Sequence, residues 1–110
     1  MAVENNFPKD SDERSKLEEE YTPGVLNMMD SDRPNNRLIG GLNFVGTIKA
    51  YRESGRKIRV KDKVLFAVAD TTEMVMRFRA IQLGWRPEDV EEEIVRGREI
   101  YYKKHPEDKK

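Results

Sequence analysis

Basic side chains are concentrated in the segment GRKIRVKDK, residues 55–63, which places five bases and one acid in nine positions. The whole chain of 110 residues has a formal net charge of zero, so this density is local. Guanidinium and ammonium groups packed this closely attract phosphates and carboxylates, which indicates contact with an anion. The alternation with Ile58 and Val60 predicts that an extended segment would present its bases on one side. A solvated loop anchored by those two apolar side chains is the alternative.

The charge is divided unevenly along the chain. Residues 1–32 hold nine acids and three bases, residues 33–86 hold four acids and twelve bases, and residues 87–110 hold eight acids and six bases. A basic middle region can hold either its own acidic end or an external anion. We therefore predict an anion-binding surface in the central region, with a nucleic acid or an acidic protein as the partner. The residues assigned to it are Arg52, Arg56, Lys57, Arg59, Lys61 and Lys63.

Two acids three residues apart, Asp70 and Glu73, suggest a second chemistry, because this spacing brings both carboxylates to one helix face where they could hold Mg²⁺. The stretch ADTTEMVMRFRAIQLGWRPEDVEEEIVRGREIYYKKHP around them resembles the C-terminal helices of MazG-type nucleotide pyrophosphohydrolases. That resemblance implies an all-α enzyme in which a long helix with an acidic metal motif leads into a last helix. The chain departs from the family at residues 34–54, which offer only Glu53, and at Phe66, where a glutamate is expected. Pairing of Glu73 with Arg77 is the structural alternative.

Other catalytic and cofactor chemistries find little support. The chain has no cysteine, which removes thiolate nucleophiles and sulfur-ligated zinc and fits a reducing cytoplasm. The only histidine, His105, lies in a charged segment and is expected to be solvated. We identify no nucleophile motif, phosphate-binding loop or dinucleotide fingerprint, and no apolar run approaches the ~20 residues of a membrane span. We assign no catalytic residue, metal or cofactor, and favour a non-enzymatic protein.

Three helices must position these groups. The pattern predicts a helix over residues 34–54, capped by Ser31 or Asp32 and ended by Gly55, and a second from Lys61 or Asp62 to Leu83 with Gly84 as its stop. A third begins at Pro87 and runs to about residue 104. Apolar residues at steps of three and four predict the buried faces of the first and third helices. They are Leu38, Leu42, Val45 and Ile48 in the first, and Val90, Ile94, Gly97 and Tyr101 in the third.

The second helix is expected to be the central one, or to be covered by a second copy of the protein. Its segment VLFAVA, residues 64–69, is apolar on every side, which is typical of a buried helix. Farther along, Met74, Val75, Met76, Phe78 and Ile81 keep an apolar side, and the methionines are expected to fill the core. Three glycines in the first helix, Gly40, Gly41 and Gly46, each cost about 1 kcal/mol relative to alanine. Either a close helix crossing offsets that cost or the helix is broken there.

The two ends are expected to lie outside the domain formed by residues 33–104. Residues 1–32 predict a flexible acidic arm, in which the apolar patch around Val25 and Met29 packs on its own domain or in a partner groove. Residues 105–110 predict a frayed charged tail. Trp85 is expected to close one end of the bundle.

Taken together, these patterns predict an all-α protein, a small bundle of three main helices with a flexible acidic N-terminal arm. The function they favour is that of a cytoplasmic regulatory or adaptor protein whose basic central region binds an anionic partner. The arm would compete with that partner, because tethering gives it a high effective concentration. A MazG-like enzyme and a purely structural protein-protein interaction subunit, which could form a homo-oligomer, are the alternatives.

Overall fold

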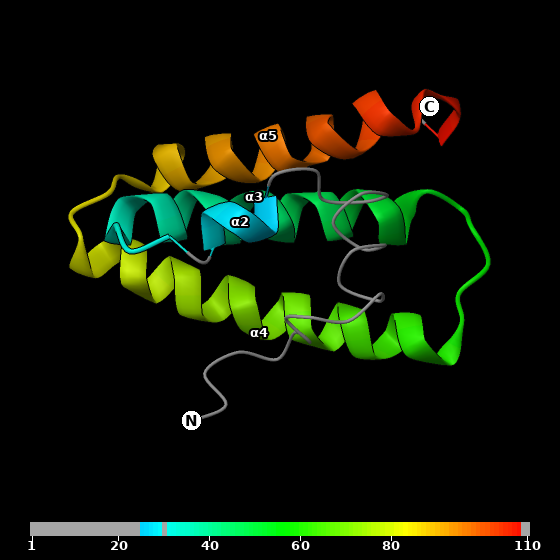
Figure 1. The fold of residues 1–110 in the computed structure, drawn as a ribbon, viewed down its shortest axis with the longest axis horizontal. Coiled ribbons are helices and arrows are strands. Elements are labelled where there is room, and N and C mark those ends of the chain that lie inside the picture. Colours follow the sequence, from blue (N-terminus) through cyan, green and yellow to red (C-terminus); the bar gives the residue numbers. More distant parts are fainter. Residues whose placement is uncertain (1–24, 30, 109–110) are drawn as a thin grey trace.

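The protein is an all-α bundle of three main helices (Figure 1). The computed structural model describes residues 25–29 and 31–108. Within them the chain forms helix α2 (Val25–Met29), the long helices α3 (Pro34–Glu53), α4 (Val60–Gln82) and α5 (Pro87–Lys104), and a 3-10 turn η1 (Pro106–Asp108). The three predicted long helices are confirmed to within one or two residues at each end. No strand occurs among the described residues.

The central element is α3 rather than α4, so the prediction that the second helix is central is wrong. In Figure 1, α3 lies between α4 and α5, and α2 packs on α3. Every residue from Gly40 to Ile48 is buried, which shows that α3 is enclosed around its whole circumference. By contrast, Val64 and Ala67 of the VLFAVA segment are exposed. Small residues explain the difference, because they let neighbouring backbones approach α3 from several sides.

Glycines make α3 and α5 cross at close range. A Cβ added at Gly46 would lie 2.8 Å from the carbonyl carbon of Ile94, and one added at Gly97 would lie 2.8 Å from that of Asn43. The approach allows Thr47 Oγ1 to donate to the Gly97 carbonyl oxygen at 3.0 Å. Asn43 Nδ2 donates to the carbonyl oxygen of Glu93 at 2.7 Å. The prediction of a close crossing is confirmed, and buried hydrogen bonds between the helices accompany it.

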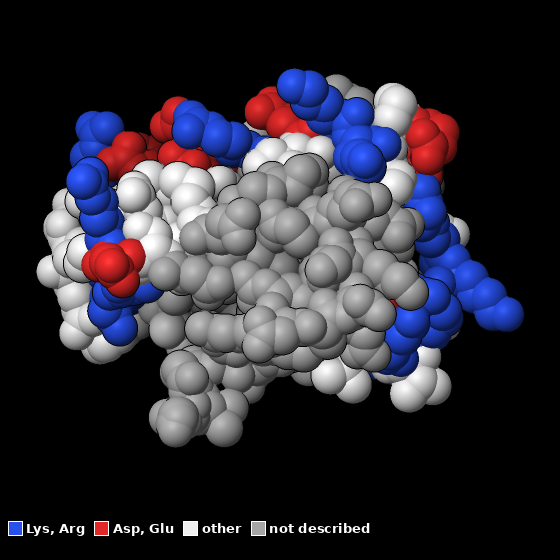
Figure 2. Space-filling model, in the orientation of Figure 1, with Lys and Arg blue, Asp and Glu red and all other residues white. Residues whose placement is uncertain are grey.

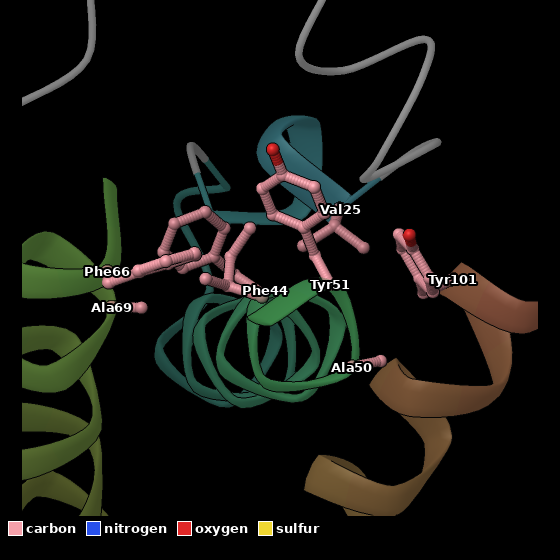
Figure 3. Close-up of a cluster of buried hydrophobic side chains, with 8 residues drawn as sticks. Val25, Phe44, Ala50, Tyr51, Phe66, Ala69 and Tyr101 are labelled. Carbon is pink, nitrogen blue, oxygen red and sulfur yellow. The ribbon is translucent and has the colours of Figure 1, made fainter. Parts of the chain in front are cut away.

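The core consists of two apolar clusters along α3. Figure 3 shows the first, in which Phe66 of α4, Tyr101 of α5 and Val25 of α2 converge on Phe44 and Tyr51. The second lies nearer the start of α3, and Trp85 packs at its edge, as predicted, and donates from Nε1 to Asn35 Oδ1 at 3.1 Å. All eight residues predicted for the faces of the first and third helices are buried. The second cluster contains Leu38, Leu42, Val45, Ala80, Val90 and Ile94.

The segment assigned to the arm is partly inside the fold. Val25 is buried in the first cluster and Met29 packs against it, which confirms that this apolar patch packs on its own domain. Residues 25–29, which were assigned to the arm, thus pack on the helical domain as helix α2. The remainder of the arm prediction, residues 1–24 and 30, lies outside the described residues.

The capping residues were predicted less well at the starts of the helices than at their ends. The N-cap of α3 is Arg33, which makes no side-chain capping bond, so the assignment of Ser31 or Asp32 as cap is wrong. The predicted stops Gly55 and Gly84 are confirmed, with φ of 88° and 79°, values that favour glycine. At the starts of α4 and α5 the N-cap residue is an arginine, and the aspartate three residues later accepts a hydrogen bond from its backbone N–H. Asp62 accepts from the Arg59 backbone at 2.9 Å, and Asp89 accepts from the Arg86 backbone at 3.4 Å.

The C-terminal segment is structured through residue 108, which corrects the prediction of a frayed tail. His105 was expected to be solvated but is only 8% exposed, and its ring lies against that of Tyr101. Turn η1 then brings Asp108 within hydrogen-bonding distance of the Tyr101 hydroxyl. Aromatic packing and this hydrogen bond offset the entropy of ordering the chain end. Lys109 and Lys110 lie outside the described residues.

Candidate interaction surfaces

The three arginines of the predicted anion site are paired with carboxylates. Arg59 contacts Asp62 at 3.1 Å, and Arg52 lies 3.7 Å from Asp70 with its guanidinium over the Phe66 ring. Arg56 is described below, in the C-terminal cluster. The partners of Arg52 and Arg56 are distant in sequence, so charge counting along the chain could not find them. About half of the positive charge assigned to this surface is therefore used within the protein.

The three lysines of the same site, Lys57, Lys61 and Lys63, are exposed. None of them pairs with a carboxylate of the described residues. They do not form the predicted extended strip, because α4 begins at Val60 and places Lys61 and Lys63 on a helix. Ile58 and Val60 are 39% and 80% exposed, so neither anchors the connector as the alternative required. Figure 2 shows blue side chains gathered at the end of the molecule where the α3–α4 connector lies.

Elsewhere on the surface basic and acidic groups alternate. Arg98 contacts Glu53, Arg96 contacts Glu92 and Glu93, and Arg86 contacts Asp89. Along α5, Figure 2 accordingly shows blue and red side chains next to one another. Within each of these ion pairs the two charges cancel, and exposed pairs of this kind contribute little to stability. The only part of the predicted basic surface without compensating carboxylates among the described residues is the lysine group at the start of α4.

The two acids that suggested a metal site are bound to basic side chains instead. Glu73 contacts Lys49 at 3.1 Å and Arg77 at 2.9 Å, and Arg77 also contacts Glu91 at 2.7 Å. Burial opposes ionisation of Glu73, but these hydrogen bonds hold the pKa of its carboxyl below the usual value. Asp70 faces Arg52. A carboxylate that already neutralises two cations is a poor ligand for Mg²⁺, which prefers uncompensated oxygen ligands.

A polar cluster at the C-terminal end also has the ligand types of a metal site. The ligand atoms of His105, Glu107 and Asp108 lie within 4.8 Å of one another. The guanidinium of Arg56 sits among them, with Nε 2.7 Å from Asp108, and Nη2 3.1 Å from both Glu107 and His105 Nδ1. A fixed positive charge in this position repels a metal cation. The cluster instead ties the α3–α4 connector to the C-terminal turn.

The same cluster perturbs two ionisable groups. Hydrogen bonds from Tyr101 and Arg56 lower the pKa of Asp108 below its usual range. Burial, followed by the hydrogen bond to Asp108, raises the pKa of Tyr101 to about 12. Both shifts favour a neutral phenol that donates to an ionised carboxylate, which is the arrangement expected of a structural contact.

The most extensive exposed apolar surface belongs to α4. Seven residues at alternating steps of four and three lie on the side of the helix that faces away from α3, and all seven are exposed. Val60, Met74, Phe78 and Ile81 are 80%, 73%, 62% and 73% exposed. The prediction that the methionines fill the core is therefore wrong for Met74, whereas Met76 packs against the second core cluster. We call this surface the α4 outer face; it consists of Val60, Val64, Ala67, Thr71, Met74, Phe78 and Ile81.

The opposite side of α4 carries a second stripe with the same spacing. Phe66, Ala69 and Ala80 are buried there, Met76 packs on the second core cluster, and Asp62 is buried at the helix start. Steps of three and four place residues on one face of a helix, so two such stripes make α4 apolar on two opposite sides. Only one of them is covered within the described chain. The all-round apolarity of VLFAVA predicts either a central helix or one covered by a second copy, and the structure rules out the first alternative.

Comparisons with known proteins give no information about the function of this chain, so its surfaces are the basis of the proposals below. No family model, curated protein or solved structure matches the chain. Among the described residues, no helix combines the length and apolarity that a membrane crossing requires.

Proposed function

We propose that the protein is a non-enzymatic protein-protein interaction subunit whose α4 outer face binds a helix of another polypeptide. The observation that carries the proposal is a seven-residue stripe with alternating steps of four and three that remains exposed over the length of α4. This spacing is the seam of a coiled coil, in which each apolar side chain fits between residues of a facing helix. A helix that packs one such stripe on α3 and exposes the other to water can connect its own bundle to a second polypeptide.

The size of the exposed surface supports this function. The exposed fractions of its large side chains correspond to on the order of 600 Å² of accessible surface on each chain, at the upper end of the largest apolar patch on a typical monomer. At about 25 cal/mol per Å², covering it would provide a large favourable contribution to association. A chain without cysteine suits the reducing cytoplasm, which we propose as the compartment.

Photo-crosslinking in cells of the native host tests the proposal. A photoreactive phenylalanine analogue placed at Phe78 should give protein adducts, whereas the same analogue at Val95 should not. Val95 is the matched control because it is an exposed apolar residue, 51% accessible, on the outer side of α5. Equal yields of adducts at the two positions, or none at Phe78, would reject the α4 outer face as an interaction surface.

An anionic partner is a second candidate function, supported by Lys57, Lys61 and Lys63, which have no carboxylate partner among the residues that the structure describes. Nucleic acid or an acidic protein would contact them through phosphates or carboxylates, and the affinity should fall as salt rises. Replacing the three lysines with glutamine should abolish binding to single-stranded DNA, RNA or poly-glutamate at low salt. Replacing Lys103 and Lys104, which are exposed in the last turn of α5, provides the control. Equal loss in both variants would show a non-specific charge effect and reject this function.

A further inference from the structure

We propose that the partner of the α4 outer face is a second copy of this chain, and that the two α4 helices pair antiparallel with Thr71 of one copy opposite Met74 of the other. This inference rests on the proposed function, because it names the occupant of the same surface. It follows from the packing, the charge and the area of the α4 outer face.

Packing favours the antiparallel orientation. With Thr71 opposite Met74 of the second copy, each core layer places a large residue against a smaller one. The layers, each repeated by two-fold symmetry, pair Val64 with Ile81, Ala67 with Phe78, and Thr71 with Met74. Layers that combine large and small side chains fill the space between helices evenly. A parallel pair would instead place Phe78 against Phe78 and Ala67 against Ala67, which produces one crowded layer and one void.

Charge at the margins selects the register. In this arrangement Asp70, whose side chain is 65% exposed, faces Arg77 of the second copy, and the pair occurs twice. An arginine has five N–H donors, so Arg77 can donate to Asp70 of the second copy as well as to Glu73 and Glu91 of its own chain. Val68 meets Val75 on the other margin. A shift of seven residues would place Asp70 against Asp70 and Lys63 against Arg77, which are like charges and disfavour that register.

The area is sufficient for a dimer. Two copies of a face of on the order of 600 Å² bury about 1,200 Å², which is at the lower limit of specific, stable interfaces. Closed two-fold dimers are the commonest protein oligomers, and a face used by both copies covers the stripe from Val64 to Ile81 on each of them. The same face extends about 33 Å along the 23-residue helix, so the contact is long enough to define an orientation.

The first test is the oligomeric state of the purified full chain by sedimentation equilibrium. We expect a dimer at micromolar concentrations. Phe78→Glu should raise the dimer dissociation constant by at least about 100-fold. In each copy it removes an aromatic side chain that the dimer would bury and places a carboxylate in the interface. Because Phe78 is 62% exposed, the variant should keep its circular dichroism spectrum and its monomer fold. Val95→Glu is the matched control and should leave the dimer intact. A monomeric wild-type chain at 100-fold higher concentration overturns the inference.

The second test defines the orientation with engineered cysteines, for which the cysteine-free chain provides a clean background. A mixture of the single variants Ala67→Cys and Phe78→Cys should form a heterodimeric disulfide. Val64→Cys alone should not crosslink, because its antiparallel neighbour is Ile81. A disulfide between two copies of Val64→Cys would demonstrate a parallel pair and overturn the proposed arrangement.

The two tests separate this inference from the function on which it rests. If the purified chain is a monomer but the analogue at Phe78 crosslinks to a different protein in cells, the interaction surface stands and the second copy is rejected. If the chain is a monomer and the analogue gives no adduct, both proposals fail. An adduct of two copies of the chain, together with the Phe78→Glu effect, supports both.

Discussion

The crossing of α3 and α5 gives the sharpest test of how this sequence specifies its fold. Gly97→Ala adds one methyl group at the point where the two backbones meet. The new Cβ would lie 2.8 Å from both the carbonyl carbon and the Cα of Asn43, whereas carbon atoms pack at about 3.5–4.0 Å. Because the obstacle is backbone, the helices must separate by about 1 Å.

That separation has a cost that can be worked out from the contacts at the crossing. Overpacking costs about 1–3 kcal/mol, and stretching the bond from Thr47 to the Gly97 carbonyl or from Asn43 to the Glu93 carbonyl adds about 1–3 kcal/mol for each buried group left unsatisfied. The better helix propensity of alanine returns about 1 kcal/mol. We expect the free energy of unfolding to fall by about 3 kcal/mol, the centre of the range that these terms give, which is a large share of the 5–15 kcal/mol of a typical domain.

Gly41→Ala is the matched control, because it makes the same change on the central helix. Its Cβ would meet Met76, with Sδ at 2.5 Å and Cγ at 2.7 Å, and a flexible thioether side chain can move aside. We expect an effect within about 1 kcal/mol of zero. Urea unfolding of both variants at one fixed protein concentration, followed by the fluorescence of the single tryptophan, Trp85, measures the difference. Equal stabilities of the two variants would refute the conclusion that backbone contact determines the glycine at position 97.

Three further predictions concern the ionisable groups and the N-terminal segment. Burial opposes ionisation of Asp62, but bonds from Arg59 and Tyr51 lower its pKa overall, so its stabilisation is present above the unfolded pKa of about 3.9 and is lost as pH falls through the folded value. Asp62→Asn should therefore flatten the acid limb of the stability curve measured by urea unfolding between pH 5 and pH 2; an unchanged slope contradicts this. The pKa of Tyr101, raised to about 12, predicts the opposite sign: its stabilisation is complete below pH ~10 and is lost as pH rises through the folded value. Tyr101→Phe should remove this latest step from the absorbance titration of the folded protein at 295 nm, and a titration that keeps the step refutes the assignment. Deleting residues 1–22, which spares the buried Val25, should tighten binding to polyanions at low salt if the acidic segment competes for the lysines, and unchanged affinity would reject the competition.

The sequence was sufficient to predict the helices because their signals are local. Pro87 followed by two acids marks the start of α5, and the positive φ of Gly55 and Gly84 follows from the end of each preceding helix. The choice of central helix was wrong because it depends on which backbones can approach most closely. That property is set by glycines such as Gly46 and Gly97, which meet the backbones of Ile94 and Asn43, about fifty positions away in the sequence.

The candidate surfaces were predictable only in part, since charge pairing is a tertiary property. Arg56 is separated by 52 residues from Asp108, its nearest carboxylate, and no count of charges along the chain links the two. Lys57 carries the same formal charge as Arg56 and adjoins it, yet it has no carboxylate partner among the described residues. The basic segment was therefore identified correctly as a cluster in sequence, but its division into structural arginines and exposed lysines required the fold.

This division also links the basic segment to the α4 outer face. Arg56 ties the connector to the C-terminal turn, and Arg59 holds Asp62 at the start of α4, so both arginines bind the segment that leads into α4. In α4 the stripe that contains Phe66 and Ala69 packs toward α3, and the stripe that contains Phe78 faces outward. Part of the charge in GRKIRVKDK is thus used within the fold, next to α4, and the exposed apolar face of that helix is the feature through which we expect the protein to act.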